Sequence, residues 1–259
     1  MIAKELKNKP LVEAILEVRW GLESPVPNTS IDPHYKILLG RLYDRLQEQY
    51  PQHEQLPTAL MPDEITGHIV QQRFRVAADD WPLVQLGPGI LTLNETAKYT
   101  WEDFRNRAVS IIDKLYDAHP KVTDLKVIDL QLRYIDAVDF DVTKKDVFGF
   151  LNENLKISIN MPKSLFTTTG ITELPHQFNF ITSFMCSEPK AEIRIRFATA
   201  TRQDATPILL WETVMHSAGD DIPEMPTGFA DWLDKSHTIT NDWFFKLIKG
   251  DLERRFNCE

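Results

Sequence analysis

A β-hairpin followed directly by a capped helix is the most constraining feature of this sequence. Residues 83–86 and 90–93 are two runs that favour strands, and Gly87-Pro88-Gly89 between them is typical of a compact chain reversal. Thr100 then stands at a helix N-cap position, with Asp103 three residues later in the capping-box spacing. The stretch 81–101 therefore predicts two paired strands that lead into a helix.

The same order of elements can be traced through both parts of the chain. In residues 12–20, apolar side chains at the even positions alternate with mainly charged side chains at the odd positions, as in a half-buried strand. Residues 130–134 show a similar alternation of apolar or aromatic with polar side chains. A helix is expected after each strand, over 35–46 in the first part and after a cap at Thr143 in the second. The last helix is expected to open at Thr227, with a break near Thr240 and Asn241.

These patterns predict an α+β fold with mainly antiparallel sheets and helices packed on one side. Residues 1–122 and 123–259 would each have the order β-α-β-β-β-α, which suggests a duplicated unit. A chance likeness between two common α+β arrangements would give the same order, because the halves share little sequence identity. The sequence leaves open whether the strands form one saddle-like sheet or two packed sheets.

Composition limits the class of protein. With 259 residues, 42% of them hydrophobic, the chain can bury a full core without a metal or a disulfide. Its only cysteines, Cys186 and Cys258, are far apart, which fits a reducing cytoplasm. The sequence has no signal peptide and no membrane-spanning run, so we expect a soluble protein. It also has no cofactor or metal motif, so we expect neither a cofactor nor a metal. A net charge of -9 disfavours nucleic acid as the partner.

Three segments, residues 8–19, 84–101 and 132–136, resemble a sporadically distributed bacterial family of uncharacterised proteins of similar length. The first contains the family's P-hydrophobic-V-E-A strand motif as Pro10-Leu11-Val12-Glu13-Ala14, and the second contains the Gly87-Pro88-Gly89 turn. The resemblance covers most of the chain in order, including a similar last helix. Such patchy occurrence implies a gene that travels with mobile elements or defence loci. It supplies no catalytic residue, since the family has no settled function.

Arginines recur at the polar positions of the predicted strands. If these positions share one sheet face, the guanidinium groups could bind phosphate or carboxylate groups in bidentate fashion. Alternatively, they pair with acidic residues on neighbouring strands, for which Glu13, Glu17, Asp129 and Glu192 are the candidates. The candidate ligand-binding residues are Arg19, Arg73, Arg75, Arg133, Arg194 and Arg196.

The other acidic groups have structural interpretations. Glu13 and Glu17 are four residues apart on one strand, roughly 13 Å, which is too far for a shared catalytic role. Asp136, Asp139 and Asp141 offer oxygen ligands, but their spacing matches no cation-binding loop, and a solvated strand end is expected instead.

The last helix is unusually aromatic. Trp232, Trp243, Phe244 and Phe245 cannot all face one core, so the helix either lies between two layers or docks a partner. His237, on its apolar side, is expected to be partly buried and hydrogen-bonded.

The leading hypothesis is a non-enzymatic binding or assembly module of a bacterial defence-type or mobile-element locus, with a protein partner or a second copy of itself. It follows from the lack of a catalytic motif and from the aromatic surplus. The alternative is an enzyme or nucleotide sensor that binds phosphate-bearing ligands, which requires Arg73, Arg133 and Arg194 to converge in one pocket. Nucleic-acid binding across a saddle-like sheet, by analogy with TATA-binding folds, rests on topology alone.

Overall fold

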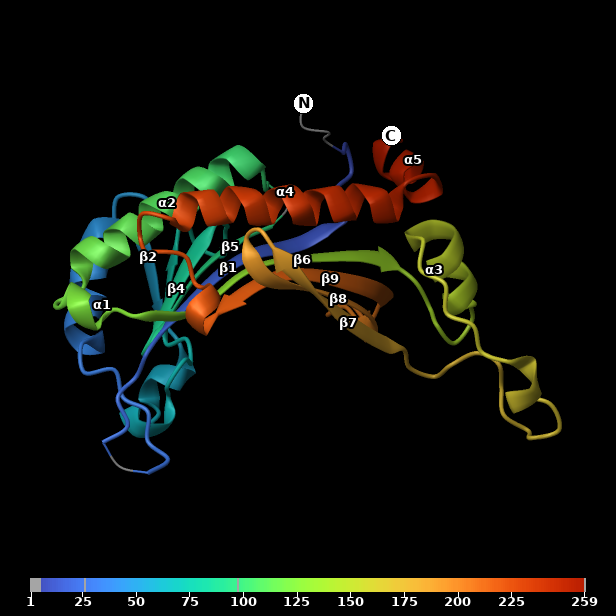
Figure 1. The fold of residues 1–259 in the computed structure, drawn as a ribbon, viewed down its shortest axis with the longest axis horizontal. Helices are drawn as coiled ribbons and strands as arrows, with labels where there is room; N and C mark the ends of the chain where they lie inside the picture. The colour runs from blue at the N-terminus through green and yellow to red at the C-terminus, as the bar shows by residue number, and fades with distance from the viewer. Residues whose placement is uncertain (1–5, 26, 97, 259) are drawn as a thin grey trace.

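The computed structural model describes residues 6–25, 27–96 and 98–258, and the strands in these ranges form one antiparallel sheet (Figure 1). The strands are β1 (Leu11–Trp20), β2 (Gln52–Gln55), β3 (Gln72–Arg75), β4 (Leu83–Gly87), β5 (Ile90–Glu95), β6 (Val127–Asp139), β7 (Asn179–Ser187), β8 (Lys190–Thr201) and β9 (Pro207–Ala218). Their order across the sheet is β2-β3-β4-β5-β1-β6-β9-β8-β7. Of the two arrangements left open by the sequence, a single continuous sheet is correct.

The helices cover one face of this sheet, as predicted (Figure 1). They are α1 (Tyr35–Leu46), α2 (Trp101–Ala118), α3 (Val147–Leu155), α4 (Phe229–Ile248) and α5 (Asp251–Asn257). Short 3-10 segments span Pro57–Leu60, Asp63–Ile65, Val122–Asp124, Lys163–Leu165 and Gly219–Asp221. Arg105 on α2 donates hydrogen bonds of 2.5 and 2.7 Å to the two carboxylate oxygens of Asp234 on α4, which joins helices from the two halves.

The order of elements is β1-α1-β2-β3-β4-β5-α2 in the first half and β6-α3-β7-β8-β9-α4-α5 in the second. The first half has one strand more than predicted, the short polar strand β2. The two opening strands, β1 and β6, pair antiparallel at the middle of the sheet. Descent of the halves from one repeated unit stays a prediction.

The hairpin at residues 83–95 is confirmed. β4 and β5 pair from Leu83 opposite Asn94 to Gly87 opposite Ile90. Gly87 has to be a glycine, because a Cβ atom there would lie 2.0 Å from the backbone oxygen of Ile69. The cap is also confirmed, because the Thr100 side chain accepts a hydrogen bond from the Asp103 backbone N–H at the start of α2.

Three predicted helix boundaries are wrong. Asp146, not Thr143, caps α3, while the Thr143 side chain bonds to Asp141 in the preceding turn. The N-cap of α4 is Gly228, one residue after the predicted Thr227. α4 continues without interruption through Thr240 and ends near Gly250, where a φ of 117° suits glycine and turns the chain into α5.

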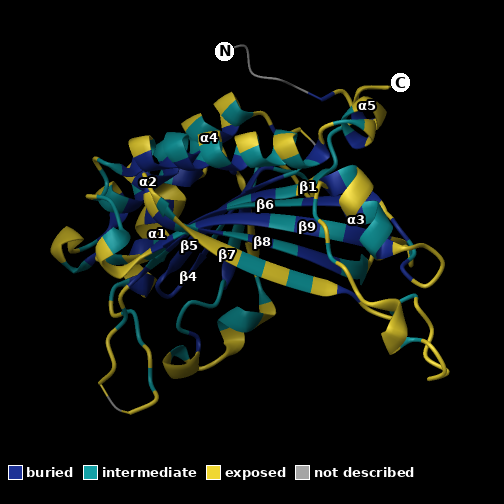
Figure 2. Cartoon of the chain, turned by 45° about the vertical axis from the view of Figure 1, so that its right-hand side comes forward, coloured by how far each residue is buried: buried dark blue, intermediate teal, exposed yellow. Residues whose placement is uncertain are grey.

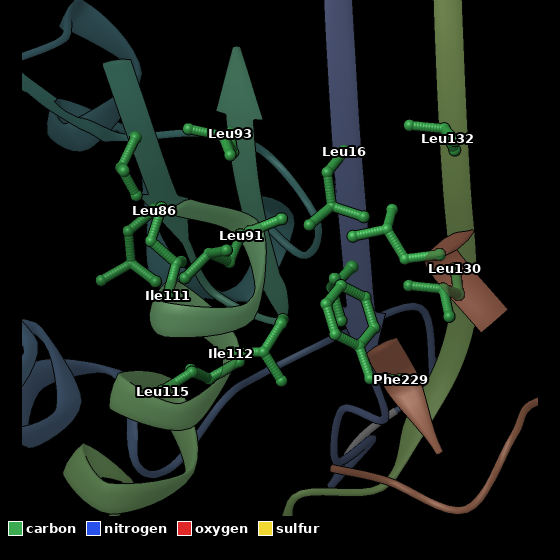
Figure 3. Close-up of a cluster of buried hydrophobic side chains, with 14 of the residues drawn as sticks. Leu16, Leu86, Leu91, Leu93, Ile111, Ile112, Leu115, Leu130, Leu132 and Phe229 are labelled. Atoms are coloured by element: carbon green, nitrogen blue, oxygen red, sulfur yellow. The ribbon is translucent and has the colours of Figure 1, made fainter. Parts of the chain in front are cut away.

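The main core lies between the sheet and the helices and draws on both halves. Leu16 on β1 and Leu91 on β5 meet Leu130 on β6, Ile112 on α2 and Phe229 on α4 (Figure 3). A second buried cluster joins α3, α5 and the end of α4 to β8 and β9. Each fully buried Leu or Phe contributes about 1.5–3 kcal/mol through loss of contact with water, so the shared core favours folding of the halves together.

The two ends of the described chain meet on the helix side of the molecule (Figure 1). The Asn8 backbone N–H donates to the Phe256 carbonyl at 2.8 Å, and the Asn8 side-chain amide donates to the Cys258 carbonyl at 2.6 Å. None of the described helices is both long and apolar enough to cross a membrane.

Candidate functional site

The sheet face opposite the helices, here called the open face, is the candidate site. Alternation along β1 buries Leu16 and Val18 under the helices and directs Glu13, Glu17 and Arg19 to the open face. No α-helix of the described residues packs on this face, and the strands show partly exposed positions there (Figure 2).

All the predicted arginines lie on the open face. Their strand positions have the opposite parity to buried neighbours such as Phe74 on β3, Leu132 on β6 and Ile195 on β8. The structure therefore brings onto one surface the side chains Arg19, Arg73, Arg75, Arg133, Arg194 and Arg196.

Most of these arginines pair with carboxylates. Arg19 contacts Glu17 at 2.7 Å. Four of the other arginines pair with Glu54 on β2 or Glu212 on β9, which were not among the predicted partners. Glu54 lies 3.1 Å from Arg73 and 3.6 Å from Arg75, and Glu212 lies 3.4 Å from Arg133 and 3.9 Å from Arg196.

Arg73, Arg133 and Arg194 do not converge. Arg73 is on β3 and Arg133 is on β6, with β4, β5 and β1 between them. At about 4.8 Å per strand, four spacings separate their backbones by roughly 19 Å. Arg194 lies two strands farther, on β8. The arginines are distributed across the surface and do not line one pocket.

Hydrogen bonds link the open-face side chains of the first half into a continuous chain. Arg73 donates to Gln85 at 3.2 Å, and Gln85 donates to Asn94 at 3.2 Å. Thr92 donates to Asn94 at 2.6 Å, and Asn94 donates to Glu13 at 2.9 Å. Burial raises the pKa of Glu13, against the hydrogen bond from Asn94 and the charges of Arg133 and Arg73.

A second chain continues on the other half. His216 and Gln131 bond to Asp129 at 2.7 and 2.8 Å, and Arg133 donates to Gln131 at 3.3 Å. The bond to Asp129 raises the pKa of His216 despite burial. Burial acts to raise the pKa of Asp129, but the hydrogen bonds from His216 and Gln131 outweigh it and lower that pKa. We call the two chains together the polar lattice.

The polar lattice is an ordered surface. Thr92 and Asn94 are only 4% and 5% exposed although no α-helix of the described chain covers them. Their donors and acceptors are fixed by one another, so the surface presents a set pattern of charges and hydrogen-bonding groups.

The expected solvated strand end is wrong for Asp136, and the three residues Asp136, Asp139 and Asp141 do not form a cluster. Asp139 pairs with Arg202 at 2.5 Å, and Asp141 bonds to Thr143 and Lys144. Asp136 is buried on the helix side of β6. Within the described ranges, no three His, Cys, Asp or Glu side chains are grouped so as to hold a metal ion.

The aromatic residues of α4 are distributed over both buried clusters. Trp232 is 2% exposed and donates its indole N–H to Ser217 at 2.9 Å. Trp243 packs against both clusters, and Phe244 and Phe245 pack against the second. This packing accounts for the aromatic surplus within the chain, and a partner at these residues stays a prediction.

A buried polar group between β6 and α4 was missed by the sequence analysis, apart from His237. Tyr134 on β6 bonds at 2.9 Å to both His237 and Tyr99, and His237 stacks on Trp101 with ring centres 3.6 Å apart. Burial lowers the pKa of His237 to about 4 and raises that of Asp136 to about 8. The sequence did contain a signal for this group. Tyr134 and Asp136 are at alternate positions of β6 and continue the series of buried residues Leu130 and Leu132.

No family model and no curated protein matches this chain. One solved structure, of the di-domain ARO/CYC StfQ from the steffimycin biosynthetic pathway, matches over 94% of this chain and 99% of that chain with 10% sequence identity and a TM-score of 0.22. A likeness at this level carries no argument about fold or function.

Proposed function

We propose that this protein is a non-enzymatic binding module that recognises a macromolecular partner with the open face of its sheet. The polar lattice is the observation that carries the proposal. Its side chains are already held by one another, so binding a partner would cost little side-chain entropy. The resemblance to a sporadically distributed bacterial family supports a partner encoded in a defence-type or mobile-element locus.

The charge pattern favours a protein partner. Glu54 and Glu212 alternate with arginines across the face, so a uniformly anionic ligand would meet repulsion as well as attraction. Arg194 is partly exposed, and within the described ranges it has no carboxylate at ion-pair distance. It is suited to an acidic side chain of the partner.

Site-specific crosslinking tests which face of the protein binds the partner. A photo-crosslinking amino acid would replace Arg194 on the open face or Arg41, which is exposed on the helix side, and the variants would be expressed in the native host. We expect a defined crosslinked protein from position 194 only. With that protein purified, Arg194→Glu should weaken its binding at least about tenfold, a loss of about 1.4 kcal/mol, and Arg41→Glu should not.

Two results would count against this proposal. Equal crosslinking from both positions would mean that the open face is not the binding surface. Saturable binding of a nucleotide in isothermal titration calorimetry, lost in Arg194→Ala, would instead support the alternative of a phosphate-bearing ligand.

A further inference from the structure

The two edges of the sheet differ in how well they are protected. Edge strands expose unpaired backbone groups, and proteins usually shield them with charges, prolines, bulges or short length. β2 at one edge has four residues, including Glu54. β7 at the other edge has nine residues, with no charged residue and no proline, and pairs with β8 without a bulge.

Large apolar side chains are exposed along β7, which crosses the front of the molecule in Figure 2. Ile181 is 52% exposed, Phe184 is 51% exposed and Met185 is 77% exposed. These three residues lie within five positions of one strand. A strand that is long, uncharged and apolar at a free edge is a site for pairing with another strand.

The backbone direction of β7 follows from one hydrogen bond at its start. The Thr199 backbone N–H donates to the Phe178 carbonyl at 3.0 Å, which makes these opposite residues a hydrogen-bonded pair. Such pairs alternate along an antiparallel ladder. Even-numbered residues of β7 therefore bond to β8, while Ile181, Ser183 and Met185 direct their N–H and C=O groups to the free edge.

We propose that β7 pairs antiparallel with β7 of a second copy of this chain, centred on Ser183, to form one continuous sheet across both copies. This register is self-complementary. It sets Ile181 of one copy opposite Met185 of the other on the open face, and Phe184 opposite Thr182 on the helix side. Ile181 and Met185 of the two copies thereby cover one another.

Charge favours the same register. On β8, Arg196 is next to Ile181 and Glu192 is next to Met185. In the joined sheet, Arg196 of one copy and Glu192 of the other stand in one row, so opposite charges flank the apolar contact. The two Arg194 side chains would be three strand spacings apart, about 14 Å, which exceeds the screening length of about 8 Å at physiological salt.

The pairing does not rest on the proposed function, because it uses the strand edge and leaves the polar lattice of each copy free. Sedimentation velocity of the full chain over about 1–100 μM tests it, since a single strand pair is a small interface that binds reversibly. We expect a concentration-dependent shift from the mass of one chain to twice that mass.

Substitutions test whether β7 forms the contact between the two copies. Met185→Lys should raise the dissociation constant at least about tenfold, because it introduces a charge opposite Ile181 of the second copy. Ser183→Pro should do the same by removing an edge N–H, and proline is tolerated on a free edge. Ile37→Lys is the matched control, since Ile37 is 56% exposed on α1 and its replacement should leave the dimer intact.

Disulfide trapping tests the register, in a background with Cys186→Ser and Cys258→Ser. Ser183→Cys should form a crosslinked dimer on mild oxidation, because opposite hydrogen-bonded residues have Cα atoms about 5.5 Å apart. Met185→Cys should not, because the two Met185 positions would be four residues apart along neighbouring strands, about 14 Å.

Four results would overturn the proposal. They are a monomer at every concentration, a dimer that Met185→Lys leaves unchanged, equal weakening by Ile37→Lys, and faster trapping through Met185→Cys than through Ser183→Cys.

Discussion

At the scale of single residues, Asp136 is a carboxylic acid buried on the helix side of β6. Burial raises its pKa to about 8 in the folded chain, against about 3.9 in an unfolded one. Between these values folding takes up a proton, so the contribution of Asp136 to stability is full below about pH 4 and is lost as the pH rises to about 8. His237 acts in the opposite direction, because burial lowers its pKa to about 4.

We therefore expect Asp136→Asn to raise the free energy of unfolding at pH 7, by up to about 4 kcal/mol, and to have little effect at pH 4. Urea denaturation of both proteins from pH 4 to pH 8 gives the difference between them, in which the titration of His237 cancels. Parallel stability curves would show that Asp136 is ionised in the folded protein.

Tyr134 supplies a second prediction, because its hydroxyl lies between Tyr99 and His237. Tyr134→Phe leaves both of these groups without this partner, so the free energy of unfolding should fall by about 1–3 kcal/mol. Tyr116→Phe is the matched control. Tyr116 is half-buried, and its hydroxyl has no hydrogen bond to any residue in the described ranges. Equal losses in chemical denaturation would mean that the hydrogen bonds of Tyr134 contribute nothing.

At the scale of secondary structure, the two threonines predicted as helix caps differ. Thr100 caps α2, whereas Thr143 bonds within a turn before α3. Thr100→Ala should lower the free energy of unfolding by about 1 kcal/mol, and Thr143→Ala should change it by less than about 0.5 kcal/mol. Thermal denaturation of the pair measures this, and a larger loss from Thr143→Ala would contradict the assigned caps.

The same contrast shows which elements can be predicted from sequence. Alternation predicts β1, and turn chemistry predicts the β4–β5 hairpin, because both signals are local. β2 consists of four exposed residues, Gln52–Gln55, and carries no periodic signal. Its pairing with β3 requires that β3 already be in place. Thr143 and Asp146 are both suitable caps, and the choice between them depends on where α3 packs.

At the scale of the whole molecule, the main core includes Leu16, Leu91 and Ile112 from one half and Leu130 and Phe229 from the other. We therefore predict that the halves unfold together. Far-UV circular dichroism and tryptophan fluorescence should give coincident transitions in guanidinium chloride. Two separated transitions would show that residues 1–122 and 123–259 are independent domains.

Predicting the candidate site also required the arrangement of the whole sheet. Strand periodicity places the arginines on one face, and this can be read from sequence. The acids that pair with them depend on strand order. Glu54 reaches Arg73 because β2 lies beside β3, and Glu212 reaches Arg133 because β6 lies beside β9. No local pattern carries either neighbour relation.

The contact of Asn8 with Phe256 and Cys258 determines which surface stays accessible when the protein is immobilised or fused through one of its ends. Both ends of the described chain lie on the helix side, near α5 (Figure 1). Attachment of the protein to a biosensor chip through either end would therefore turn the polar lattice toward the flowing analyte. The same would hold for a fused fluorescent protein, which would leave that surface accessible.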